Sequence, residues 1–215
     1  MSVIITWEEI QLLALMNGAT GLFGFQSGNL LQKERVPETL LRLIERGLVT
    51  PTDNGFCCTA AATAPLDNML HAAHYLLLTN VPRELPQLCC YCKGEGLTVL
   101  EPIREQKNGF KLYTIALNEL VELLGEDGYL PEPTPEADCS GVSFELLNSM
   151  SDPVLQDDTS LLFLAKRTDH SGGKESSAAI VLRGKEALLL TATDEDQKAC
   201  GFTLDRLKQW MKGEF

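Results

Sequence analysis

Three strand-like stretches in the last third of the sequence place the strongest constraint on its fold. They read LLFLAKR, AAIVLR and ALLLTAT, at 161–167, 178–183 and 187–193. Residues 161–165 are apolar without the alternation of a half-exposed strand, so both faces of this strand should be covered. A helix over 203–212 follows, with Thr203 as its N-cap. The pattern predicts an antiparallel sheet with helices packed against it.

A coarse repeat extends this pattern to the middle of the chain. Residues 66–124 carry helical periodicity (66–79), three strand-like stretches (87–93, 97–104 and 110–115) and a second helix (117–124). A short helix over 144–150 would give the last part of the chain the same order. We therefore predict an α+β fold with one central antiparallel sheet, built from two α-β-β-β-α halves. The predicted lobes are 66–125 and 144–215, and an acidic, proline-rich linker at 126–143 joins them.

The first 65 residues predict a separate, winged-helix-like segment. Thr6 and Glu9 have the spacing of a capping box, so a helix should run to Met16. A second helix should begin near Pro37 and end at Gly47. The sequence LVTPTDNGFCCT after it is typical of a hairpin, the wing of such a module.

The charge of the chain favours protein partners over nucleic acid. The formal net charge is -12, and residues 126–160 contain nine acidic residues and no Lys or Arg. A protein of this charge repels phosphate backbones. A winged helix often reads DNA, which leaves a transcriptional regulator as an alternative. However, the predicted recognition helix balances Arg42 and Arg46 with Glu38 and Glu45, and the wing TPTDNG is not basic.

The stretch LCCYCKGEG, residues 88–96, matches one copy of the C-x-x-C-x-G-x-G zinc repeat. A structural zinc site needs four ligands, and His71 with His74 on one helix face could complete a site with Cys89 and Cys92. If 87–93 is a strand, however, those two cysteines point to opposite faces about 10 Å apart. We expect Cys90 and Cys92 to pack inward as small hydrophobes and no metal or other cofactor to bind.

Signals for catalysis, export and membrane insertion are weak. SGGKES resembles a phosphate loop but has Glu175 where Ser or Thr should be, and no G-x-S-x-G or G-x-G-x-x-G occurs. The sequence begins without a basic region before its first apolar residues, and no apolar run is long enough for a membrane span. The odd number of cysteines fits a reducing compartment. We expect a cytoplasmic protein that is not an enzyme.

The chain resembles the EspG family of type VII secretion chaperones. The residues that carry the likeness are LIERGLV at 43–49, the predicted helix at 66–79, and the stretch from Leu161 to Thr193. The resemblance implies a quasi-twofold protein with a central antiparallel sheet, which binds the helical-hairpin tip of a secreted substrate in the cytosol. More loosely, the chain is similar to type III secretion chaperones.

These observations predict a cytoplasmic protein that holds an amphipathic helical partner, as a secretion-associated chaperone or adaptor. Such a protein needs an apolar groove for its partner and no catalytic group. The candidate groove residues are Phe163, Ile180, Leu188 and Leu190, for which core packing is the other reading. A winged-helix regulator and a small zinc-binding protein stay open as alternatives.

Overall fold

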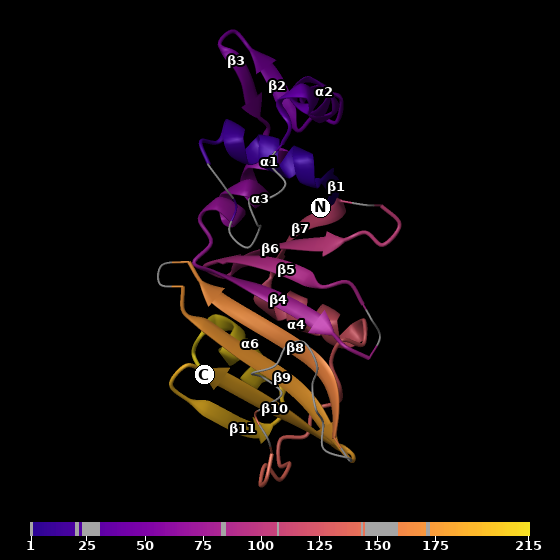
Figure 1. Ribbon diagram of the computed structural model, residues 1–215, viewed down its shortest axis with the longest axis vertical. Helices are drawn as coiled ribbons and strands as arrows, with labels where there is room; N and C mark the ends of the chain where they lie inside the picture. Colours follow the sequence, from indigo (N-terminus) through magenta and orange to yellow (C-terminus); the bar gives the residue numbers. More distant parts are fainter. Residues whose placement is uncertain are drawn as a thin grey trace. The chain divides into compact units, whose positions relative to one another are not determined.

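A computed structural model describes residues 2–19, 22, 31–82, 85–106, 108–142, 144, 159–170 and 173–215. Its main feature is an antiparallel sheet of nine strands in the order β1-β7-β6-β5-β4-β8-β9-β10-β11 (Figure 1). Strands β2 and β3 form a separate two-stranded sheet. The predicted α+β class with a large antiparallel sheet is therefore confirmed.

The chain forms two compact units, and each unit is discontinuous in sequence. The first comprises Met1–Tyr75 and Cys90–Ile115, and the second comprises Leu76–Cys89 and Ala116–Phe215. The strands are β1 (Ser2–Thr6), β2 (Val49–Thr52), β3 (Gly55–Cys58), β4 (His74–Asn80), β5 (Leu88–Lys93), β6 (Gly96–Pro102), β7 (Gly109–Ala116), β8 (Thr159–Asp169), β9 (Glu175–Arg183), β10 (Glu186–Thr193) and β11 (Gln197–Gly201). The helices are α1 (Trp7–Met16), the 3-10 turn η2 (Lys33–Arg35), α2 (Val36–Glu45), α3 (Ala60–Leu70), α4 (Leu117–Glu126) and α6 (Leu204–Lys212).

The first unit contains the predicted order of helix, helix and hairpin. The capping box that starts α1 is present: the Thr6 hydroxyl accepts from the Glu9 amide, and the Glu9 carboxylate accepts from the Thr6 amide. Helix α2 has Pro37 in its first turn. Gly47, which follows α2, has a φ of 67°, the left-handed conformation that glycine adopts without strain. Strand β1, which pairs with β7, was not predicted.

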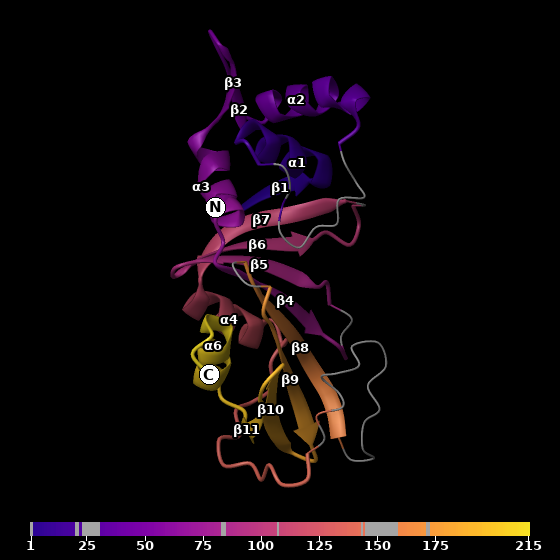
Figure 2. The same cartoon turned by 60° about the vertical axis from the view of Figure 1, so that its left-hand side comes forward.

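The second unit has a sheet whose strands β8 to β11 pair with their neighbours along the chain. Helices α4 and α6 contact each other, α6 contacts β10, and Figure 2 shows both helices on the same side of these strands. Thr203 caps α6 as predicted, because its hydroxyl accepts from the Arg206 amide at 3.2 Å. The central residues of β9 and β10 are almost completely buried on both faces of the sheet.

Two parts of the predicted repeat are wrong. The helix predicted over 66–79 ends at Leu70, and residues 74–80 form strand β4 instead. Leu76, Leu78 and Asn80 are buried there at every second position, which is the period of a strand. Strand β11 was also missed, so four strands rather than three precede both α4 and α6. The helix predicted at 144–150 lies outside the described residues, apart from residue 144.

Candidate protein-binding site

The four residues proposed for partner binding are buried within the second unit. Phe163, Ile180 and Leu188 are each 0% exposed, and Leu190 is 1% exposed. Phe163 lies opposite Ile180 in the register of β8 and β9, whereas Leu188 lies opposite Val181. Since successive side chains of a strand point to opposite faces, Leu188 and Leu190 share one face and Phe163 and Ile180 the other. The structure therefore does not bring all four onto one surface.

The face that holds Leu188 and Leu190 is covered by residues of the predicted linker. Its buried members are Leu161, Ala179, Val181, Leu188, Leu190 and Ala192. Ala137, Cys139, Val142 and Phe144 pack against them and are partly buried. We call residues 131–142 the strap. The strap has no helix or strand, yet it is docked on the unit rather than extended away from it.

Two arginines and Thr134 hold the strap in place, and a glycine lies beneath it. The Thr134 amide donates to the carbonyl of Phe202 at 2.9 Å, and its hydroxyl accepts from the amide of Ala187 at 3.2 Å. Arg183 donates to the backbone carbonyl of Ser140 at 2.9 Å and to that of Asp138. Arg206 donates to the carbonyl of Pro135 at 3.2 Å. A Cβ on Gly201 would lie 2.7 Å from the carbonyl carbon of Pro135, closer than atoms pack, so only glycine fits beneath the strap.

Ionisable groups in the strap and beneath it have shifted pKa values. The amide of Ser140, followed by its hydroxyl, donates to the Asp138 carboxylate and lowers the pKa of Asp138 below its ordinary value. Burial raises the pKa of the Cys139 thiol, and burial likewise raises the pKa of Cys200 in β11. Both thiols therefore have less thiolate at neutral pH than an exposed cysteine would have.

A buried carboxylate organises the first unit. The Glu9 side chain is 2% exposed, and its Oε2 atom lies 2.8 Å from Nη1 of Arg46. Arg42 approaches Glu9 to 3.9 Å and pairs with Glu38 at 3.2 Å. The two arginines of the predicted recognition helix are thus engaged within the chain. This arrangement weakens the DNA-binding alternative, because a DNA-binding protein needs cationic side chains that are directed at the phosphates.

Large exposed apolar side chains gather in the first 60 residues. Ile4, Leu15, Leu41 and Phe56 are each about half exposed or more, and they lie on β1, α1, α2 and β3. Single exposed apolar residues are common on any protein. Their presence on four elements of the first unit nevertheless makes it a second candidate surface for a protein partner.

The geometry on which the zinc alternative depended is absent from the structure. His71 follows the last residue of α3, and His74 begins β4, so the two do not share a helix face. Cys90 and Cys92 are buried in β5, as expected for small hydrophobes. Among the described residues, no group of three or more His, Cys, Asp or Glu side chains could hold a metal ion.

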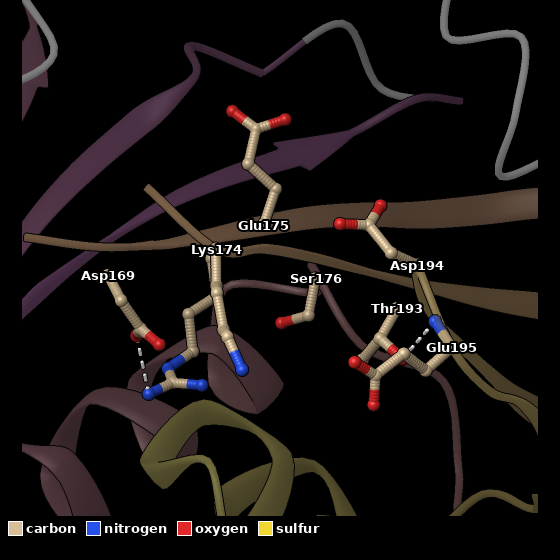
Figure 3. A pocket seen from close by; sticks show the side chains of 8 residues that line it. Asp169, Lys174, Glu175, Ser176, Thr193, Asp194 and Glu195 are labelled. Atoms are coloured by element: carbon tan, nitrogen blue, oxygen red, sulfur yellow. Dashed lines mark hydrogen bonds and ion pairs between the residues drawn. The ribbon is translucent and has the colours of Figure 1, made fainter. Parts of the chain in front are cut away.

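A polar cavity of about 190 Å³ lies where β8 ends and β9 begins (Figure 3). Arg167 pairs with Asp169 at 2.7 Å, and its guanidinium lies against Gly213 at the C-terminal end of α6. A cation at that end complements the helix dipole, which gives Arg167 a structural role. Across the cavity, Figure 3 shows Asp194 and Glu195. The lining is therefore made of charged and hydroxyl side chains.

No protein-family model and no curated protein matches the sequence. Among solved structures, the chain is similar to the type VII secretion system chaperone EspG5 of Mycobacterium tuberculosis, in complex with the PE25-PPE41 dimer. The TM-score is 0.60 at 8% sequence identity, over 99% of this chain and 95% of that chain. At this identity the likeness establishes the fold alone. The resemblance to EspG proteins is thus confirmed at the level of the fold.

Sequence reasoning missed the residues that organise these surfaces. Arg183 and Gly201 have no local signal that links them to the strap, which lies about 40 to 70 residues earlier in the chain. Arg46 was considered only as a possible phosphate contact. No sequence rule pairs charged residues that lie far apart in the chain. Gly201, in contrast, could have been noticed as a glycine near the end of an apolar strand region.

Proposed function

We propose that this protein binds another protein in the cytoplasm, as a secretion-associated chaperone or adaptor that holds an amphipathic helical partner. The observation that carries this proposal is the fold likeness to EspG5 over nearly the whole chain. That structure is of a chaperone in complex with a protein dimer. The likeness favours a binding protein over an enzyme.

The charge and the surface of the chain support the same function. A net charge of -12 opposes nonspecific binding to nucleic acid, and the arginines of α2 are already paired with Glu9 and Glu38. Among the described residues, no helix is long and apolar enough to cross a membrane. The exposed apolar residues of the first unit offer surface for a helix.

Copurification from the native host, followed by mass spectrometry, tests the proposal. We expect one protein to be enriched and to form a stoichiometric complex when both proteins are purified and mixed, as measured by light scattering after gel filtration. Capture of DNA fragments alone, in a salt-sensitive manner, would refute the chaperone proposal.

Variants can then locate the partner surface. Replacing Leu41 with Glu places a charge on the exposed face of α2, where the leucine is 56% exposed. A matched substitution at exposed Thr50 should leave binding unchanged if the partner contacts α2. Equal loss of binding in both variants would indicate a general effect on the first unit rather than a contact.

A further inference from the structure

The cover over the face of Leu188 and Leu190 is looser than the face itself. The sheet residues beneath it are 9% exposed or less. In contrast, every residue of the strap is at least partly exposed, including its inward residues Ala137, Cys139 and Val142. The strap therefore covers apolar surface without becoming part of the core.

The arginine bonds that hold the strap are made by groups that water can reach, whereas the bond from the Ala187 amide to the Thr134 hydroxyl is partly buried. The hydrogen bonds from Arg183 to the carbonyls of Asp138 and Ser140 are exposed, as is the bond from Arg206 to Pro135. Exchanging an exposed hydrogen bond for one to water costs little, because the freed donor and acceptor are solvated at once. None of these bonds needs to break together with a bond of the sheet.

Ordering the strap has an entropic cost that its contacts only partly offset. About a dozen residues are fixed, and each loses backbone freedom. Their apolar contribution comes from a few small, half-buried side chains. Segments with few buried apolar contacts and solvent-exposed hydrogen bonds open locally, far more easily than the whole domain unfolds.

We infer that the strap is a displaceable cover, which opens while the sheet stays folded and competes with the partner for the face beneath it. The partner segment that fits is apolar with acidic flanks, like the strap itself. When the strap leaves, Arg183 and Arg206 remain beside the apolar face, and these cations complement carboxylates. The competition rests on the proposed function, whereas the opening does not.

Hydrogen exchange of the purified protein tests the opening without any partner. The variant Gly201→Ala adds a Cβ where the strap backbone lies, so it should lift the strap. Gly125→Ala is the matched control, because a Cβ there meets nothing within 4 Å. The Thr134 amide donates to the Phe202 carbonyl at 2.9 Å, so it is protected while the strap is docked. In the wild type, this amide should exchange at least about 100-fold faster than those of β10. Gly201→Ala should raise strap exchange at least about tenfold further, and Gly125→Ala should not.

Alkylation of Cys139 gives a second measurement of the same opening. Its rate should rise in Gly201→Ala, and also in Arg183→Gln, which removes the charge-assisted bonds from the opposite end of the strap. Strap amides that exchange as slowly as those of β10 would overturn the inference, since the strap would then open only on global unfolding. That outcome would leave the proposed chaperone function intact.

A labelled peptide with the sequence of residues 137–142 tests what the face accepts, because it carries the inward residues of the strap but not Thr134 and Pro135, which a Cβ at position 201 would meet. We expect it to bind Gly201→Ala at least about tenfold more tightly than it binds the wild type, because its own strap competes there. A scrambled peptide of the same composition is the control. Equal binding to both proteins, or none to either, would contradict competition for the face.

Discussion

Replacing Glu9 with glutamine removes a buried charge while keeping the size of the side chain. The carboxylate Oε2 accepts from the Thr6 amide at 2.8 Å and from Nη1 of Arg46 at 2.8 Å. A glutamine carbonyl can still accept from one of these donors. The variant therefore isolates the charge that joins α1 to the end of α2.

The expected loss of unfolding free energy depends on the burial of Glu9 and on the partial exposure of Arg46. A hydrogen bond to a charged group contributes about 1.5–3 kcal/mol, against about 0.5–1.5 kcal/mol for a neutral one. Arg46 is 34% exposed and can regain water, which reduces the loss. We expect Glu9→Gln to lower the free energy of unfolding by about 1–2 kcal/mol. Glu9→Ala should cost about 3 kcal/mol, because the capping interaction is lost as well.

Urea denaturation followed by circular dichroism measures this loss, with Glu8→Gln as the control. Glu8 pairs with Arg35 at 3.5 Å, and Arg35 is 61% exposed, so the control should lose less than about 0.5 kcal/mol. A double-mutant cycle with Arg46→Ala should return a coupling of about 1 kcal/mol. If Glu9→Gln loses no more than Glu8→Gln, the view of Glu9 as the organising charge of the first unit is wrong.

Three further results are expected. Hydrogen bonds from Ser140 depress the pKa of Asp138, so the stability that the ionised Asp138 contributes to the fold is fully present at neutral pH. This contribution is lost as the pH falls through the folded-state pKa, below about 3.9. In carboxyl-carbon NMR titrations, Ser140→Ala should raise the pKa of Asp138 part of the way, and an unchanged pKa would contradict the role of Ser140. In the native protein, iodoacetamide should modify exposed Cys57 well before Cys92, which is 3% exposed, and equal rates by mass spectrometry would contradict the burial of β5. Gel-shift assays should detect no DNA complex at physiological salt, because the cations of α2 are paired with carboxylates; a complex that survives that salt would favour the regulator instead.

Local signals were sufficient for the elements whose ends are marked by side-chain chemistry. The capping box of Thr6 and Glu9 predicted the start of α1, and Thr203 predicted the start of α6. Gly47 marked the end of α2. In each case the residues that determine the boundary lie within one turn of it, so a sequence window contains the whole interaction.

The boundary between α3 and β4 could not be found in this way. The apolar residues at 66, 69, 70, 73 and 77 fit a helical stripe, and no Gly or Pro separates the helix from the strand. Leu76, Leu78 and Asn80 fit a strand equally well, and their burial by other strands decided the outcome. Strand β11 was too short and too polar for its pattern to be recognised.

The candidate surfaces depended even less on local pattern. The four apolar residues proposed for a groove are buried in strands, and the face that each occupies depends on register. The strap was predicted as a linker from its prolines and acids. Its attachment by Arg183 and Gly201 arises only when residues far apart in the chain are brought together by the fold.

The discontinuity of the two units limits how the protein can be divided. The chain passes between them near residues 75, 89 and 115, so no single cut yields an intact unit. Strand β1 needs β7, whose residues come more than 100 positions later. A fragment that ends after α3 would leave β1 without this partner, with an open edge that invites aggregation. Deletion mapping of a partner would therefore measure misfolding, and point substitutions on the intact chain are the appropriate way to assign its contacts.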